Sequence, residues 1–166
     1  MKNTLLVICF FLFLSNCGGF EFVYKTNDDS FSIKTFTKIY VNGDNASQVY
    51  ILMRELVGDN KDNSPKYRLS ANVIKEEIAE VITKDATASK FNIKYSINYE
   101  LYNLNKNCNI FNKQISTVST YNTKSAGYSF GTDLSEKESN ANNIIKNINE
   151  FITSLNELIS LDNCNN

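Results

Sequence analysis

The sequence predicts an α+β fold, a two-layer sandwich in which about four mostly antiparallel strands form one sheet and two helices cover one of its faces. Four segments alternate apolar and polar residues with the period of two that is typical of half-buried strands. Two other segments repeat apolar residues at spacings of three and four, as amphipathic helices do. A chain of 166 residues fits one such domain rather than two.

The first strand is predicted over Ser32–Val41, and the segment Asn42-Gly43-Asp44 then interrupts it. Its apolar residues on one face are Ile33, Ile39 and Val41. A short helix is predicted next, over Ala46–Val57, with Asn45 as its cap and Gly58 just beyond its end. Its apolar stripe, which we expect to pack on the sheet, consists of Val49, Leu52, Met53 and Leu56.

The second strand begins with the alternating segment Tyr67–Val73. The following segment, Ile74–Ile82, allows two interpretations, because its apolar residues fit a helical stripe and also alternate imperfectly. We predict a bulged continuation of the strand. After a turn at Lys84–Thr87, the third strand is predicted over Phe91–Leu101, which has the cleanest alternation in the chain and therefore one apolar and one polar face.

A hairpin turn at Asn103–Asn109 leads to a fourth strand that runs from Phe111 to about Thr123, so the last three strands form an antiparallel meander. A long amphipathic helix is predicted over Asp133–Leu161. Its stripe consists of Ala141, Ile144, Ile145, Ile148, Ile152, Leu155, Leu158 and Ile159. This stripe is broad enough to belong to the core. The alternative is that it pairs with a helix of a partner.

The N-terminal segment has the pattern of a secretory signal, with Lys2 followed by the apolar run Leu5–Leu14, which is too short to span a bilayer. The sequence Leu14-Ser15-Asn16-Cys17 resembles the lipobox of bacterial lipoproteins, in which the cysteine is acylated and the chain is cut before it. We therefore expect a signal peptide over 1–16 and a lipidated tether over 17–30, with lipid on Cys17. The alternative is a signal peptide that is cut elsewhere, which would leave Cys17 a plain thiol.

The composition excludes several function classes. The chain has no histidine, so it contains no Ser-His-Asp or Cys-His pair and no histidine-based metal site. Its formal net charge is −1, which does not suggest a nucleic-acid-binding surface. The acidic cluster Glu76, Glu77 and Glu80 is the one candidate for acid–base chemistry, but a solvated charged patch explains it better. We expect no enzyme activity, no cofactor and no metal.

Two cysteines, Cys108 and Cys164, remain beyond the signal and the lipid site. An exported chain folds where disulfides persist, so these two residues could pair and tie the hairpin turn to the C-terminal end. The alternative is two unpaired surface thiols, because Cys164 lies in a polar tail over 162–166. The domain itself is predicted to span 31–161.

The order of short motifs from Ala86 onward resembles the LptE family, the lipoprotein subunit of the outer-membrane lipopolysaccharide translocon, in its alphaproteobacterial form. No single motif is specific, but their order covers about half of the chain, and the lipobox and the strand start Tyr67-Arg68-Leu69 agree with it. The motifs are Ala86-Thr87 before the third strand, Tyr99-Glu100-Leu101-Tyr102 at its end, Ser119-Thr120-Tyr121-Asn122, Ser125-Ala126-Gly127-Tyr128, and then the long helix.

This resemblance implies a non-catalytic protein at the outer membrane that plugs the lumen of an LptD-type β-barrel, assists its assembly and supports lipopolysaccharide insertion. It makes Arg68, Lys90 and Lys94 candidates for contact with lipopolysaccharide phosphates. A polar sheet face would suit a water-lined lumen, although an ordinary solvated face explains it too; its residues include Asn92, Lys94, Asn98 and Asn112. The alternative function is a generic envelope lipoprotein that binds a protein through the Phe91–Tyr99 face.

Overall fold

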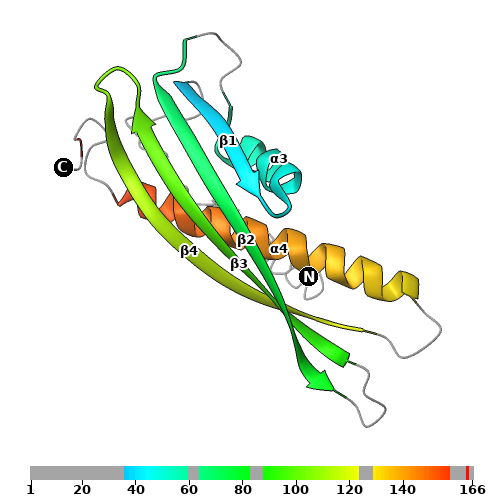
Figure 1. Ribbon diagram of the computed structural model, residues 1–166. Helices are drawn as coiled ribbons and strands as arrows, with labels where there is room; N and C mark the ends of the chain where they lie inside the picture. Colours follow the sequence, from blue (N-terminus) through cyan, green and yellow to red (C-terminus); the bar gives the residue numbers. More distant parts are fainter. Residues whose placement is uncertain (1–35, 60–63, 83–87, 124–128, 158–163, 165–166) are drawn as a thin grey trace, which may run out of the picture. The chain divides into compact units, whose positions relative to one another are not determined.

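Figure 1 shows the computed structural model, which describes residues 36–59, 64–82, 88–123, 129–157 and 164. The elements follow one another as β1 (Thr37–Gly43), α3 (Ala46–Leu56), β2 (Tyr67–Ile82), β3 (Ala88–Asn103), β4 (Cys108–Asn122) and α4 (Ser129–Asn156). The four strands form one sheet, and both helices lie on the same side of it. This arrangement confirms the predicted two-layer α+β fold.

The strands lie in chain order across the sheet, β1-β2-β3-β4. β2, β3 and β4 are antiparallel neighbours, as the predicted meander requires. β1 is parallel to β2, with Thr37 opposite Tyr67 and Gly43 opposite Val73. A parallel pair needs a crossover between its strands, and the short helix α3 provides it.

β1 ends where the backbone turns away from β2 at Gly43. This residue has φ +97°, and a Cβ atom in its place would collide with the carbonyl oxygen of Val73. Glycine is therefore required here for both conformation and space. The next residue, Asp44, donates its N–H to the Val73 oxygen over 3.0 Å, and its carboxylate accepts the N–H of Lys75 over 2.8 Å. These two contacts end the parallel pairing.

β2 continues to Ile82 as a strand, which confirms the predicted bulged continuation and excludes the helical alternative for Ile74–Ile82. Its pairing with β3 shifts in register between Ala79 and Val81 and again between Val81 and Ile82. Because β1 ends opposite Val73, this second half of β2 has β3 as its only neighbouring strand within the described part of the chain.

The apolar core lies between the sheet and the two helices. α3 buries Val49 and Met53 against it, and the aromatic rings of Tyr99 and Phe151 stack with 4.3 Å between their centroids. α4 contributes fully buried residues to this core rather than to a free surface, which favours the core interpretation of its stripe. The buried apolar residues of α4 are Ile144, Ile148, Phe151 and Leu155.

Several predicted boundaries differ from the structure. β1 begins at Thr37 instead of Ser32, and it continues to Gly43. α4 begins four residues before the predicted Asp133 and ends at Asn156 instead of Leu161. The signal segment, Cys17, the tether, Ile33, the turn at Lys84–Thr87 and the residues Leu158–Leu161 lie outside the described residues.

Candidate functional site

The sheet has one face without helices, which we call the open face. It carries the even-numbered side chains of β2 and β3, whereas the odd-numbered ones point to the helices and form the core. All three predicted phosphate-contact residues, Arg68, Lys90 and Lys94, belong to this open face, and so do Asn92 and Asn98. Near its centre, the hydroxyls of Ser96 and Ser116 are 2.9 Å apart.

The cations of the open face already have partners in the sheet. The Lys94 ammonium donates to Glu76 over 3.0 Å, and the Lys90 ammonium lies 2.7 Å from a carboxylate oxygen of Glu80. The Arg68 guanidinium lies 4.8 Å from the centroid of the Tyr102 ring, a distance suited to a cation–π contact. These exposed pairs contribute little to stability, so they can exchange partners at low cost.

The three candidate cations do not form one cluster. Arg68 is in register with Tyr102, whereas Lys94 is in register with Glu76, eight residues farther along β2. At about 3.3 Å per residue, this places Arg68 and Lys94 on the order of 26 Å apart. A single phosphate group cannot contact both residues, so any shared ligand has to be long.

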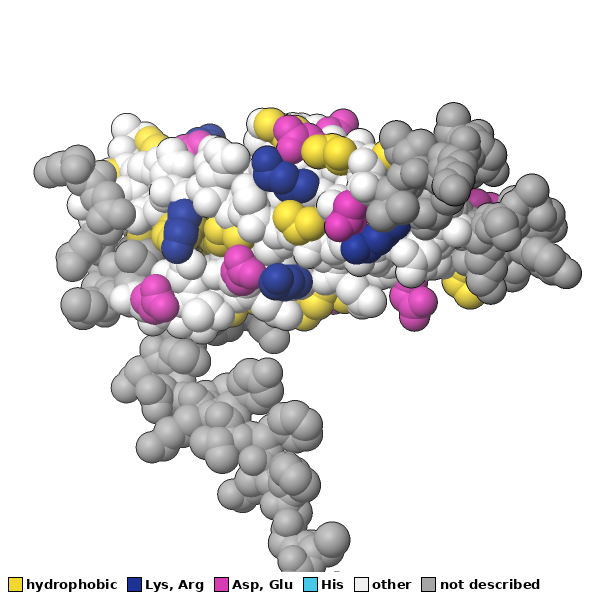
Figure 2. Space-filling model, turned by 90° about the horizontal axis from the view of Figure 1, so that it is seen from below, with side chains coloured by type: hydrophobic (Ala, Val, Ile, Leu, Met, Phe, Trp, Pro, Cys, Tyr) yellow, Lys and Arg dark blue, Asp and Glu magenta, His cyan; other side chains and the backbone are white. Residues whose placement is uncertain are grey.

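Charges of both signs are mixed on the surface. In the view of Figure 2, basic and acidic side chains alternate among other polar groups, with hydrophobic side chains scattered between them. Three apolar residues of the open face are half exposed or more: Ile74 at 50%, Ile78 at 60% and Val118 at 52%. The open face is thus polar and mixed in charge, with isolated apolar side chains.

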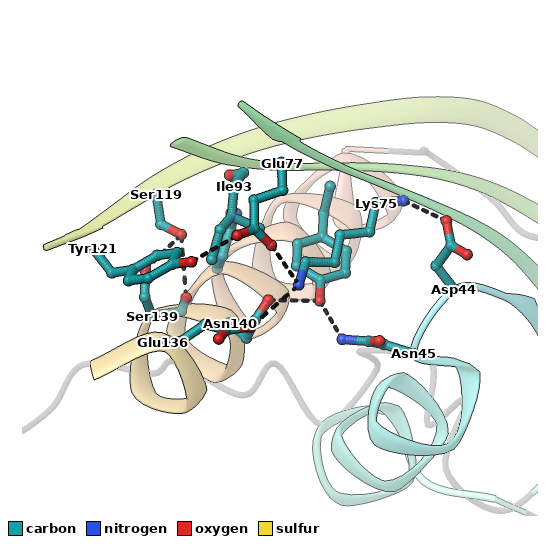
Figure 3. Close-up of polar contacts among 12 residues, drawn as sticks. Asp44, Asn45, Lys75, Glu77, Ile93, Ser119, Tyr121, Glu136, Ser139 and Asn140 are labelled. Carbon is teal, nitrogen blue, oxygen red and sulfur yellow. Dashed lines mark hydrogen bonds and ion pairs between the residues drawn. The ribbon is translucent and has the colours of Figure 1, made fainter. Parts of the chain in front are cut away.

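A second polar group, which we call the junction cluster, lies between the sheet and the N-terminal half of α4 and consists of Lys75, Glu77, Tyr121, Glu136 and Asn140 (Figure 3). The Tyr121 hydroxyl donates to Glu77 over 2.6 Å. The Lys75 ammonium lies 3.3 Å from Glu77 and 3.6 Å from Glu136. Burial and then the nearby Glu77 carboxylate raise the pKa of Tyr121.

Tyr95 connects the junction cluster to α3. Its hydroxyl accepts the side-chain N–H of Asn45 over 2.6 Å and donates to Asn140 over 2.9 Å. Burial raises the pKa of Tyr95 to about 12, and the carboxylates of Asp44, Glu136 and Glu77 act in the same direction. The phenol therefore stays protonated at neutral pH and serves as a hydrogen-bond donor, not as a base.

Three asparagines on α4 that the sequence did not indicate as buried face the sheet: Asn140, Asn143 and Asn147. The Asn147 amide donates to the Ile115 carbonyl and to the Thr117 hydroxyl, each over 3.0 Å, and its oxygen accepts the Tyr99 hydroxyl over 2.9 Å. Asn143 donates to the Ile93 carbonyl over 2.8 Å. Their spacing of three and four residues was a helical signal, but polar side chains on a stripe normally indicate a solvent-facing side.

The acidic cluster does not form a pair of neighbouring carboxylates. Glu76 and Glu80 lie on the open face and each has a lysine partner, whereas Glu77 points to the helices. The described residues contain no group of three metal-ligating side chains. Within the same residues, no helix is both long and apolar enough to cross a membrane.

Cys108 and Cys164 form a disulfide in the structure, with their Cα atoms 5.8 Å apart. Cys108 is the first residue of β4, directly after the turn that connects it to β3. The bond therefore attaches the C-terminal end of the chain to this end of the sheet.

Comparison with known proteins finds the same fold in bacterial lipoproteins. No family profile and no curated protein matches the sequence. A candidate lipoprotein of Caulobacter crescentus has a TM-score of 0.58 and 12% identity, over 75% of this chain and 88% of that one. The rare lipoprotein B of Shewanella oneidensis has a TM-score of 0.53 and 9% identity, over 73% of this chain and 93% of that one. A minor lipoprotein of Acinetobacter baumannii has a TM-score of 0.51 and 7% identity, over 75% of this chain and 94% of that one. At these identities the similarity establishes a shared fold.

Proposed function

We propose that this chain is an outer-membrane lipoprotein, anchored by lipid on Cys17, that occupies the lumen of an LptD-type β-barrel. In this role it helps the barrel to assemble and supports the insertion of lipopolysaccharide into the outer leaflet. The observation that carries the proposal is the two-layer fold shared with bacterial lipoproteins, in a chain whose N-terminal motif ends at Cys17. The motif order that resembles LptE supplies the family, and the fold similarity does not favour its alphaproteobacterial form.

The open face of the sheet supports a role inside a water-lined lumen. A porin-like lumen is lined by polar side chains, and the open face offers polar side chains and charges of both signs along two strands of 16 residues each. Its exposed ion pairs can exchange with charges on a barrel wall at low cost. A partner that surrounds the domain would contact this face directly, because no helix covers it.

A non-catalytic role agrees with the protonation of the buried tyrosines and with the ion pairs of the acidic cluster. The buried tyrosines have raised pKa values, and each carboxylate of the acidic cluster has a lysine within ion-pair distance. The alternative of an adaptor that binds through the Phe91–Tyr99 face is not compatible with the structure. Its apolar side chains from Ile93 to Tyr99 are completely buried, so they are not available to a partner.

The first test is co-purification from envelopes solubilised in mild detergent, with a tag on the C-terminus of the full chain. We expect a large barrel in stoichiometric amount that changes its gel mobility on boiling. Cys17→Ala should abolish palmitate incorporation and release the protein from the membrane fraction. If the lipoprotein purifies alone, the proposed role inside a barrel is contradicted. The remaining interpretation is then a generic envelope lipoprotein.

Direct contact with lipopolysaccharide is tested by reversing two open-face charges, Arg68→Glu together with Lys94→Glu. The purified domain should then bind lipopolysaccharide about tenfold more weakly, because two separated phosphate contacts are replaced by repulsion. The control with the same change in net charge is Arg54→Glu together with Lys146→Glu, on the exposed sides of α3 and α4. Equal binding by both variants would contradict the contact.

A further inference from the structure

The second half of β2, from Glu76 to Ile82, forms an open edge of the sheet, which we call the β2 edge. β1 covers β2 only as far as Val73, and the Asp44 carboxylate occupies the N–H of Lys75. No strand in the described part of the chain lies beside β2 beyond this point. A long strand with one unpaired side offers backbone donors and acceptors to another extended chain.

The pairing with β1 shows which backbone groups face the open side. The Val73 carbonyl and the Lys75 N–H both point toward β1. Successive residues of a strand direct their backbone groups to alternate sides, so Glu77 and Ala79 present their N–H and C=O groups to the open side. The alternate residues, Glu76 and Ile78, direct theirs to β3. The β2 edge thus has two residues ready to bind one further strand before the bulge.

The charges of the β2 edge restrict which strand can pair with it, but they leave two residues open before the bulge. Natural sheets often block their edges with charged side chains or bulges. Here the bulge begins only after Ala79, and each of the three glutamates already has a lysine partner. The residues from Glu76 to Glu80 are all exposed, although the Glu77 carboxylate also contacts Lys75 and Tyr121 on the side of the helices.

The two faces of the β2 edge specify different neighbours. On the side of the helices, the single ammonium of Lys75 lies between the carboxylates of Glu77 and Glu136, which leaves an acidic excess of one charge (Figure 3). A basic residue opposite Glu77 would balance this excess. On the open face, Ile74 and Ile78 flank Glu76 and would pair with apolar side chains of a neighbouring strand. A second copy of this chain is a poor fit, because it would bring a second acidic excess to the same place.

We propose that the β2 edge binds an extended segment of the barrel partner as a fifth strand of the sheet. This segment carries a lysine or arginine toward Glu77 and Glu136 and apolar side chains toward Ile74 and Ile78. Backbone hydrogen bonds give such strand addition its affinity, and the alternating side chains give its specificity. The inference rests on the proposed function and identifies where the partner is held.

The first experiment compares Glu77→Pro with Glu77→Ala in the full, tagged chain. Both variants lose the contacts of Glu77 with Lys75 and Tyr121, but only proline also removes the outward N–H. The bonds from β2 to β3 are retained in both, because proline is tolerated where its N–H would face away from the neighbouring strand. We expect Glu77→Pro to recover at least tenfold less barrel than Glu77→Ala, with thermal midpoints that agree within a few degrees. Equal recovery of the barrel would overturn the proposal.

The second experiment does not depend on how well the proline variant folds. A photoreactive benzoylphenylalanine at position 78 should crosslink to one extended segment of the barrel, identified by mass spectrometry, and the yield should fall when Glu77→Pro is added. The same probe at position 118, on β4, should give a yield that Glu77→Pro does not change. Crosslinks from position 78 to another copy of this chain, or to no segment of a barrel that still co-purifies, would overturn the edge proposal alone. Absence of the barrel from the unmodified protein would overturn both proposals.

Discussion

Asn147 is the most densely bonded of the buried side chains on α4. It is completely buried and makes its hydrogen bonds to β3 and β4 at the centre of the interface between helix and sheet. A buried polar group of this kind specifies one register between helix and strands, because a shift of the helix would leave several groups unpaired.

Asn147→Ala should destabilise the domain by about 2–3 kcal/mol, because it leaves the hydroxyl of Tyr99 buried without its acceptor. Urea unfolding monitored by circular dichroism measures the loss. Asn149→Ala is the matched control on the exposed side of the same helix and should cost less than about 0.5 kcal/mol. Similar losses in the two variants would show that the buried network contributes no net stability.

The buried tyrosines predict a loss of stability at alkaline pH. The pKa of Tyr95 is raised to about 12, from the ordinary value of 10.0, and burial also raises the pKa of Tyr99. The folded state therefore holds these protons more tightly than the unfolded state. The contribution of these tyrosines to the free energy of unfolding is complete below pH 10. It is lost as the pH rises toward their pKa values in the folded state.

Urea unfolding between pH 8 and pH 12 should show this loss, with a steeper decline above pH 10. Each tyrosine in this window contributes a slope of about 1.4 kcal/mol per pH unit. Tyr95→Phe should reduce the slope between pH 10 and pH 12, whereas Tyr40→Phe, at an exposed position, should not. If the unmodified protein, Tyr95→Phe and Tyr40→Phe all have the same slope, the loss of stability does not come from Tyr95.

At the scale of the elements, the turn after β1 determines how much of β2 is covered. Gly43 allows the chain to leave the sheet, and Asp44 then occupies the next backbone groups of β2. The length of β1 is therefore fixed by one glycine and one carboxylate rather than by the hydrophobic pattern of the strand.

Gly43→Ala should destabilise the domain by about 2 kcal/mol or more, since it combines a positive φ with a collision against the Val73 carbonyl. The free energy of unfolding in urea provides the measurement. Asn42→Ala, at the exposed preceding residue, should change it by less than about 0.5 kcal/mol. An unchanged stability of Gly43→Ala would mean that the turn can relax away from β2.

The secondary structure was largely predictable because its patterns are local. Alternation identified all four strands, including Ile74–Ile82, and the stripe of Val49, Leu52, Met53 and Leu56 identified α3. The interruption at Asn42-Gly43-Asp44 was also predicted, whereas the start of β1 at Thr37 was not. Parallel pairing of β1 with β2 is a property of the tertiary structure.

At the scale of the whole molecule, the disulfide is the covalent link between the end of the chain and the sheet. Closing a loop of this length restricts the unfolded chain, so its removal should cost about 2–4 kcal/mol. Cys164→Ser and Cys108→Ser should each lower the free energy of unfolding by this amount, and the double variant should lose no more. A double variant as stable as the unmodified protein would show that the bond adds nothing to stability.

The candidate site was only partly predictable from the sequence. Alternation correctly assigned Arg68, Lys90 and Lys94 to one face, because side-chain direction follows from the period of a strand. Their partners and their separation along the sheet depend on the register between β2 and β3, which no local pattern contains. The junction cluster was missed for the same reason, since it joins residues from β2, β4 and α4.

The position of α4 at the end of the order of elements has a consequence for biogenesis. A chain that is exported as proposed folds only after it crosses the membrane, N-terminus first, so β2, β3 and β4 become available before the helix that packs on β3 and β4. Until residues 129–156 have emerged, Ile93, Ile97 and Leu101 have no cover from α4 and can attract other unfinished chains. A holding chaperone that covers this surface would therefore keep unfinished chains apart until the last helix is complete.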